Sequence, residues 1–212
     1  MNASLPPLQL APATLVGDAV RLEPLRAAHL DDLCAVGLDP ALSEYTSVSF
    51  ADRAALAAWI AQGEKGEASG RFLPFAIIDT AAGRAVGAIV LGPVSPHHRS
   101  AELSIWLGTA HRGGRLSIEY RLLLLRHAFE TLGLIRIEFR ADPGNARSVR
   151  AIRGLGAREE GRLRKCRISD RGRVFDSLVF SLIDDDWRAV EAQLLRKLAW
   201  WNRRAARVAP SP

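Results

Sequence analysis

Two glycines directly before a long leucine-rich segment are the feature that most constrains this chain. The stretch HRGGRLSIEYRLLLLRHAFE runs from His111 to Glu130, and its apolar residues recur at helical spacing. The first turn of a helix leaves backbone N–H groups without partners and carries partial positive charge, so it stabilises an anion such as a phosphate. Glycines before a helix are also ordinary loop residues. The stretch therefore allows two interpretations, a phosphate-binding loop and a plain basic turn.

Periodic segments on both sides of this helix predict a mixed α/β fold. We expect strands over residues 18–25, 71–79, 85–94, 100–108, 134–142, 157–169 and 173–183. Further helices are expected over residues 27–38, 50–62 with Asp52 as the cap, 145–156 and 184–207. This order indicates a central, mostly antiparallel sheet flanked by helices, with a C-terminal helical extension. We expect residues 1–15 to be a loosely ordered lead-in, 16–187 the domain, and 188–212 the C-terminal helix and tail.

Composition narrows the class of protein. The 212 residues, 48% of them hydrophobic, suit one domain, and no apolar run reaches the ~20 residues of a bilayer span. We expect a cytoplasmic protein that does not enter a membrane. Cys34 and Cys166 lie far apart outside any zinc-binding spacing, so no metal is expected. The net charge of +6 attracts anions, but the strands lack the alternation of aromatic and basic residues that RNA-binding sheets use, so nucleic acid is not the expected partner.

Four segments together resemble one known family. They are GDAVRLEPLRAAHLDDL (17–33), AELSIWLGTAHRGG (101–114), LLLLRHAFETLGLIRIEF (122–139) and NARSVRAIRGLGAREEGRLR (145–164). Their order and spacing resemble the GNAT superfamily of N-acetyltransferases, and the closest group is the type that acetylates the N-terminal alanine or serine of ribosomal proteins. The resemblance implies the GNAT fold over 16–187, acetyl-CoA as cosubstrate and transfer of its acetyl group to a primary amine.

The resemblance also implies a cofactor site. In this family the splayed end of a strand leaves backbone groups free for the pantetheine arm, and a loop before the next helix holds the pyrophosphate. The corresponding residues here are Trp106, Leu107, Gly108, Arg112, Gly113, Gly114, Arg115, Leu116, Ser117 and Asn145. This correspondence favours the phosphate-binding interpretation of the glycine stretch.

One position departs from the family pattern. The family loop reads Arg-Gly-x-Gly, and its second glycine corresponds to Arg115. If that position needs a positive φ, a non-glycine residue costs roughly 1 to 2 kcal/mol and its side chain obstructs the phosphate. Alternatively the loop turns at Gly113 and Gly114, and Arg115 points outwards to a phosphate of CoA.

Two residues are candidates for catalysis. Glu102 lies on the strand that leads into the loop, from which a carboxylate can accept the proton of an attacking amine; a solvent-facing strand residue is the alternative. Ser148 matches the family's Asn-x-x-Ser, in which it serves as general acid or as part of a helix cap. The position of the family's catalytic tyrosine is Ile152. Glu119 is expected to stabilise the helix dipole and His127 to lie on the helix surface.

The acceptor and the partner surface are expected from weaker signals. An α-amino group near pKa ~8 is about a tenth neutral at pH 7, whereas a lysine near ~10.4 is almost fully protonated, so a site with one base suits a peptide N-terminus. The open alternatives are a small amine or an antibiotic as acceptor, which loops around Tyr45 and Phe72 would select, and a non-catalytic acyl-CoA-binding protein. Trp200 and Trp201 indicate a partner surface, which predicts a homodimer.

Overall fold

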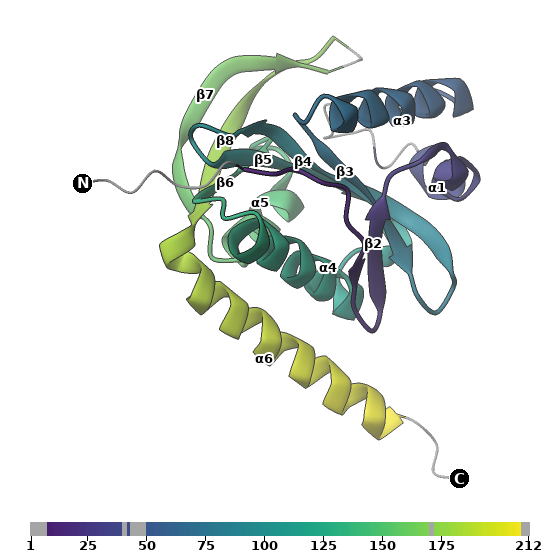
Figure 1. Ribbon diagram of the computed structural model, residues 1–212, viewed down its shortest axis with the longest axis vertical. Helices are drawn as coiled ribbons and strands as arrows, with labels where there is room; N and C mark the ends of the chain where they lie inside the picture. Colours follow the sequence, from purple (N-terminus) through teal and green to yellow (C-terminus); the bar gives the residue numbers. More distant parts are fainter. Residues whose placement is uncertain (1–7, 40–41, 43–49, 170–171, 209–212) are drawn as a thin grey trace.

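The computed structural model describes residues 8–39, 42, 50–169 and 172–208 of the chain (Figure 1). Tyr45, expected near the acceptor, lies outside this range. The elements follow in the order β1 (Leu15–Val16), β2 (Val20–Pro24), α1 (Leu30–Gly37), α3 (Arg53–Ala68), β3 (Leu73–Asp79), β4 (Arg84–Ser95), β5 (Ser100–Leu107), α4 (Gly114–Arg126), β6 (Arg136–Ala141), α5 (Ala146–Arg153), β7 (Arg158–Ile168), β8 (Val174–Ile183) and α6 (Asp184–Val208). The predicted mixed α/β architecture is confirmed.

The strands form one eight-stranded sheet in the order β1-β2-β3-β4-β5-β6-β8-β7. Every neighbouring pair is antiparallel except β5 with β6. The expected hairpin of β3 and β4 is present, and its turn is held by Asp79, whose Oδ1 accepts from the N–H of Ala81 at 2.9 Å. Asp52 caps α3 as expected, because its side chain accepts from Ala55 N at 2.8 Å. The two-residue strand β1 is not part of the sequence-based prediction.

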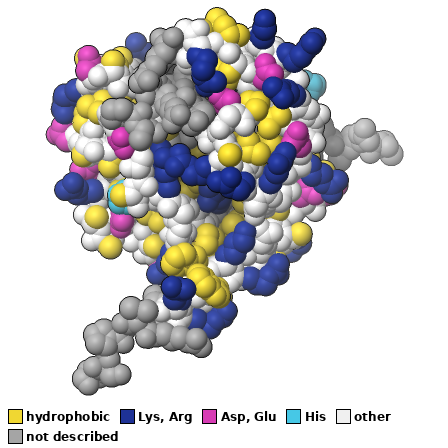
Figure 2. Space-filling view, turned by 180° about the vertical axis from the view of Figure 1, so that it is seen from behind, with side chains coloured by type: hydrophobic (Ala, Val, Ile, Leu, Met, Phe, Trp, Pro, Cys, Tyr) yellow, Lys and Arg dark blue, Asp and Glu magenta, His cyan; other side chains and the backbone are white. Residues whose placement is uncertain are grey.

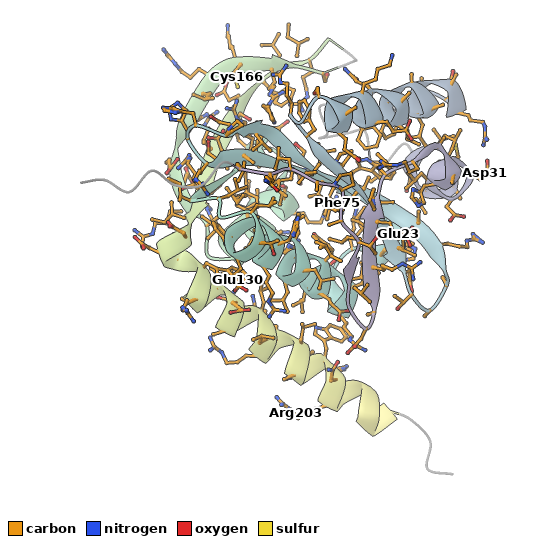
Figure 3. The ribbon with its side chains drawn as sticks, in the orientation of Figure 1. Glu23, Asp31, Phe75, Glu130, Cys166 and Arg203 are labelled. Carbon is orange, nitrogen blue, oxygen red and sulfur yellow. The ribbon has the colours of Figure 1, made fainter. Side chains whose placement is uncertain are left out.

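Helices cover both faces of the sheet (Figure 1). One face packs against α1 and α3 through a smaller cluster that includes Leu33 and Ile60, with Trp106 of β5 at its margin. The other face packs against α4, α5 and α6 and carries the main core, in which the predicted stripe of Leu122, Leu125, Phe129 and Leu132 is buried. Phe75, on β3, is 1% exposed and labelled near the centre of the molecule in Figure 3.

The long helix does not keep α-helical geometry to its end. After Arg126 the chain makes a π-helical turn, η3 (His127–Thr131). His127 is buried at 7% exposure, and its Nε2 has no hydrogen-bond partner among the described residues. The prediction that His127 lies on the helix surface is therefore wrong. The leucines that precede and follow this turn gave no sign in the sequence that His127 would point inwards.

Glu119 also differs from its expected role. The described α4 begins at Gly114, so Glu119 lies beyond the first turn and is buried at 6% exposure. Its carboxylate accepts from the backbone N–H of Asp18 at 2.8 Å and of Ala19 at 2.7 Å. Glu119 thus ties the turn between β1 and β2 to α4, and the prediction of a helix-dipole role is wrong because tertiary hydrogen bonds take its carboxylate.

The last helix, α6, packs along α4 with its first half (Figure 1). Trp187 stacks on Phe129 with ring centroids 5.6 Å apart, and its Nε1 donates to Glu130 at 2.7 Å. At the other end of the chain Leu8 and Leu10 also pack against the main core, although residues 8–14 form no regular element. No helix in the described part of the chain combines the length and the apolar character that a bilayer span requires.

Candidate active site

The two central strands separate at the middle of the sheet. β5 pairs with β6 in parallel only over residues 100–102, opposite 136–138, although β5 continues to Leu107 along its other neighbour, β4. Beyond Glu102 the edge of β5 that faces β6 therefore has no strand partner among the described residues. The predicted free backbone at Trp106, Leu107 and Gly108 lies beyond this point. Of these, Gly108 N donates to Val86 O at 2.9 Å and Leu107 O accepts from Arg112 Nε at 3.1 Å.

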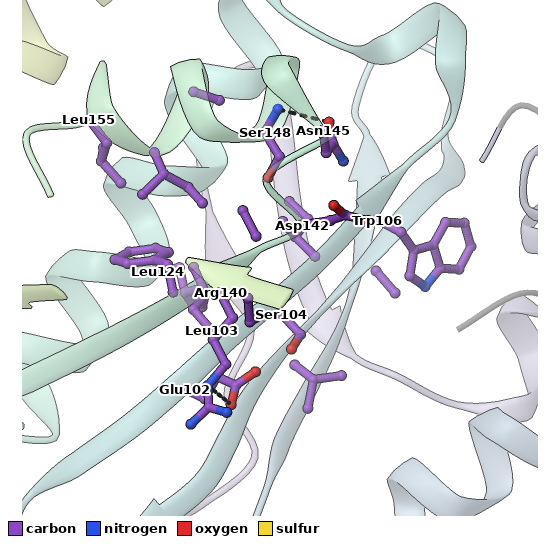
Figure 4. Close-up of a pocket in the computed structure, with 18 of the residues that line it drawn as sticks. Glu102, Leu103, Ser104, Trp106, Leu124, Arg140, Asp142, Asn145, Ser148 and Leu155 are labelled. Carbon is purple, nitrogen blue, oxygen red and sulfur yellow. Dashed lines mark hydrogen bonds and ion pairs between the residues drawn. The ribbon is translucent and has the colours of Figure 1, made fainter. Parts of the chain in front are cut away.

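A cavity of about 360 Å³ passes through this opening (Figure 4). Its size lies within the range of small-molecule sites. Leu103, Leu124 and Ile152 line it on the side of α4 and α5, and Glu102, Ser104 and Trp106 line it on the side of α1 and α3. The opening thus connects the two faces of the sheet, so that one molecule can enter from the α4 side and a second from the α3 side.

The glycine stretch lies at the end of β5, next to the opening. Gly113 has a φ of 81° and Gly114 a φ of 69°, and a Cβ added at either position would meet nothing within 4 Å. Arg115 follows inside α4 and is not among the residues with positive φ. Of the two alternatives for this loop, the turn falls on Gly113 and Gly114, so Arg115 carries no backbone strain.

Positive charge gathers beside this loop. Burial lowers the pKa of the Arg112 guanidinium, and the nearby positive charge of Arg147 lowers it further. Asp39 acts in the opposite direction, as the weakest of the three influences. Arg147 makes no ion pair with any residue that the structure describes. An arginine whose charge is disfavoured by burial and by a second arginine, at the start of a helix, fits an anionic ligand such as a phosphate.

Arg115 already has an anionic partner. Its Nη2 lies 2.7 Å from Asp18 Oδ2, and its Nε is buried with no hydrogen-bond partner among the described residues. Leu116 packs against the main core, and the buried Ser117 directs its hydroxyl to His111 O at 3.5 Å. Among the side chains of this loop, that of Arg112 is the one that contacts the end of β5, because its Nε donates to Leu107 O at 3.1 Å.

Glu102 lies in the cavity between two arginines. Its Oε2 is 3.4 Å from Arg140 Nε and its Oε1 is 3.6 Å from Arg167 Nη2. Arg140 also binds Glu138 at 2.8 Å. Figure 4 shows the pair of Glu102 and Arg140 at one end of the cavity. Both distances are longer than that of the Arg140–Glu138 pair. The Glu102 side chain is 21% exposed and lines the cavity, where a ligand amine can reach it.

Ser148 lies at the opposite end of the cavity, on α5 (Figure 4). Asn145 caps this helix, because its Oδ1 accepts from Ser148 N at 3.0 Å. The Ser148 hydroxyl makes no hydrogen bond with any described residue, so it can donate to a group in the cavity. The helix cap uses the backbone N–H of Ser148, whereas a general acid would use its hydroxyl. The two interpretations of the Asn-x-x-Ser motif, helix cap and general acid, are therefore compatible.

Aromatic side chains border the α3 end of the cavity. Trp106 packs edge-on against Trp59 of α3 and against Phe50, with centroid distances of 6.1 and 5.5 Å. Phe72 also lines the cavity. This end is therefore mainly apolar, with Glu102 and its arginines as the charged groups.

Three lining residues were not found from the sequence. Arg140 and Arg167 come to Glu102 through strand register, because residues 102 and 138 are directly paired and the β7–β8 hairpin returns across them. Tyr120 of α4 is 3% exposed and lines the cavity, and burial raises its pKa, so its hydroxyl keeps its proton at neutral pH. Arg167 could have been suspected from the density of basic residues in RLRKCR, whereas Arg140 gave no such signal and Tyr120 matched a core position.

Comparison with known proteins agrees with this geometry. The acetyltransferase (GNAT) domain family matches residues 19–158. The N-acetyltransferase p20 of Bacillus licheniformis is 26% identical over 82% of this chain and 98% of its own. A crystal structure of a GCN5-related N-acetyltransferase from Brucella melitensis superposes with a TM-score of 0.83, at 28% identity, over 92% of this chain and 90% of that one.

A further solved structure is similar in fold alone. It is RimJ from Mycobacterium smegmatis in complex with CoA-disulfide, with a TM-score of 0.73 and 24% identity, over 82% of this chain and 89% of that one. The family match covers most of the sheet, α1, α3, α4 and α5, which are the elements that build the opening and its cavity. The chain therefore belongs to the GNAT family of N-acetyltransferases.

Proposed function

We propose that this enzyme transfers the acetyl group of acetyl-CoA to the α-amino group of a peptide or protein N-terminus, by direct attack in a ternary complex. The observation that carries the proposal is the cavity through the opening between β5 and β6, with Glu102 at one end and Ser148 at the other. Bound acetyl-CoA supplies the activated thioester. The residues of this chain must hold it, orient the amine and move one proton.

The phosphates are assigned to the glycine stretch. The N–H groups of residues 112–117 at the start of α4 are suited to the pyrophosphate, as are the positive charges of Arg112 and Arg147. The pantetheine arm is assigned to the free edge of β5 beyond Glu102, where Trp106 and Asn145 border the cavity. The open space at Gly113 and Gly114 supports the assignment of the phosphates, because no side chain of the described residues fills it.

Glu102 is assigned as the base and Ser148 as a hydrogen-bond donor. The amine approaches from the α3 side; Glu102 accepts its proton as the new N–C bond forms and the C–S bond breaks. Ser148 donates a hydrogen bond to the departing sulfur. Its help need only be modest, because a thiol with a pKa near ~8.5 is already a fair leaving group. Tyr120, which keeps its proton, is a second donor on the same cavity.

The chemistry of the amine supports an N-terminus over a lysine. A single carboxylate, held in two ion pairs, must deprotonate the acceptor, and an α-amino group is already partly neutral at pH 7. The structural likeness to RimJ is consistent with this assignment in fold only. A small-molecule amine remains the alternative, favoured by the apolar lining at Trp59, Phe72 and Trp106.

Titration and turnover separate these cases. Acetyl-CoA is titrated calorimetrically into the pure protein, and release of free thiol is followed with short peptides that begin with Ala or Ser. Each peptide is paired with a control that has a blocked N-terminus and one free lysine. We expect acetyl-CoA binding, and thiol release only with the free N-terminus. Equal rates with simple aliphatic amines would favour the small-molecule alternative, and binding without turnover on any amine would leave an acyl-CoA-binding protein.

A further inference from the structure

The last helix divides into an anchored half and an arm. Trp187, Val190 and Leu194 are buried in the main core, and Glu191 pairs with Arg126 of α4 at 2.6 Å. Among the described residues, the last side-chain hydrogen bonds from α6 to the rest of the fold run from Gln193 and Lys197 to Gly154 O, at 2.7 and 3.0 Å. We call residues 195–208 the α6 arm. Figure 1 shows it extending beyond the other helices, and Figure 3 labels Arg203 near its end.

The α6 arm is strongly basic. Its sequence LRKLAWWNRRAARV contains five basic residues and no acidic one, whereas the acidic residues of the helix lie in its first half. Within the described part of the chain, Arg196, Arg203 and Arg204 form no ion pair. Positive charge at a helix C-terminus is favoured by the helix dipole, but that effect fades beyond the last turn and does not extend to Arg196.

An exposed aromatic cluster accompanies these charges. Trp200 is 48% exposed and meets the half-buried Trp201 edge-on, with centroids 5.2 Å apart. The Arg204 guanidinium lies 5.4 Å from the centroid of the Trp200 ring. Figure 2 shows hydrophobic side chains in contact with basic ones in this region, beside the C-terminal residues, with no acidic side chain next to them in that view.

The charges and exposed aromatic side chains of the α6 arm favour one kind of binding partner over others. A second copy of the arm would bring five positive charges against five, with no acidic residue to pair with them, which argues against the homodimer expected from the tryptophans. A bilayer would require an apolar face, but Leu194 and Leu198 are turned onto the core, and Leu195 and Trp200 are the large apolar side chains of the arm that are exposed among its described residues. Arginines interleaved with an exposed indole match a phosphate backbone with a stackable base.

We propose that the α6 arm binds single-stranded nucleic acid, with Arg196, Arg203 and Arg204 on phosphates and a base stacked against Trp200. This site lies on a helix, so the strand pattern sought in the sequence did not reveal it. It is separate from the acetyl-transfer cavity and does not depend on the proposed acceptor.

The test is fluorescence anisotropy with a labelled single-stranded RNA of about 20 nucleotides, a matched single-stranded DNA, and anionic lipid vesicles as a third probe. The full chain is compared with Arg203→Gln/Arg204→Gln, with Trp200→Ala, and with Arg53→Gln/Arg84→Gln. The last variant removes the same net charge from the α1 and α3 side of the molecule, where these arginines pair with Asp31 and Asp32. Melting temperature and acetyl-CoA binding verify that each variant is folded.

We expect the full chain to bind the single strands with a log–log salt slope of about −2 to −3, as three or four phosphate contacts require. The Arg203/Arg204 variant should lose about tenfold or more and show a shallower slope, and Trp200→Ala should lose at least about fivefold. The Arg53/Arg84 variant should bind like the wild type. Equal losses in both arginine variants, no binding at low salt, or binding to vesicles but not to the single strands would each overturn the proposal.

Discussion

Arg115 Nη2 lies 2.7 Å from Asp18 Oδ2, so the arginine in the glycine position of the family loop is bound by the first turn of the chain. This ion pair competes with any phosphate that Arg115 could contact. Because Asp18 is mostly exposed, the competition is weak, and exposed ion pairs are worth at most about 1 kcal/mol.

We therefore predict that Asp18→Asn binds acetyl-CoA up to about fivefold more tightly, because Arg115 is released towards the phosphates. Arg115→Ala should weaken acetyl-CoA binding, and should weaken dephospho-CoA binding less. Calorimetric dissociation constants for both ligands measure this. Tighter binding by Arg115→Ala would instead identify the side chain as an obstruction.

Glu119 is predicted to be important for stability. Glu119→Ala removes the acceptor of two backbone N–H groups and should lower the free energy of unfolding by about 2 to 4 kcal/mol. Glu119→Gln keeps one carbonyl acceptor and should cost less. Urea denaturation monitored by tryptophan fluorescence gives both values, with Glu159→Ala, at an exposed ion pair with Arg153, as the control. If Glu119→Ala lowered the free energy of unfolding no more than the control does, the two hydrogen bonds to Glu119 would not be important for stability.

His127 predicts a pH dependence of stability. Burial lowers its pKa below the ordinary 6.5, so the folded state disfavours the charged imidazole. As the pH falls below about 6.5, the unfolded chain takes up a proton that the folded chain does not, and stability decreases. From about pH 7.5 to about pH 5.5 the wild type should lose more unfolding free energy than His127→Leu. His98→Asn, at an exposed position, should follow the wild type.

Catalysis provides the fourth prediction. Glu102→Gln should lower turnover by about 10- to 100-fold, most at low pH where neutral amine is scarce, with acetyl-CoA affinity nearly unchanged. Ser148→Ala should lower turnover less, and Arg167→Ala should lie between the wild type and Glu102→Gln because it removes only one ion pair of the carboxylate. The measurement is a pH profile of thiol release on one accepted peptide. Superimposable profiles would assign deprotonation to water.

The sequence predicted the element order because each segment has its own periodicity. The stripe from Leu122 to Leu132 and the cap at Asp52 are local signals, and both are confirmed. What it missed depends on contacts between distant segments. Arg140 meets Glu102 only through the register of β5 with β6, and the carboxylate of Glu119 is buried because the β1–β2 turn covers it. His127 points inwards at a π-helical turn, and no residue type in the sequence predicts that turn. The site residues themselves stay predictions.

The short parallel contact between β5 and β6 has a mechanical consequence. The described sheet has two halves, β1 to β5 and β6 to β8. The pairing of residues 100–102 with residues 136–138 is the only strand pairing among the described residues that joins these halves. Within each half, neighbouring strands pair in antiparallel fashion. A molecule bound between β5 and β6 beyond residue 102 would contact both strands and couple the two halves of the sheet. Hydrogen exchange of backbone amides should then slow in both halves of the sheet when that molecule binds, even at residues that it does not touch.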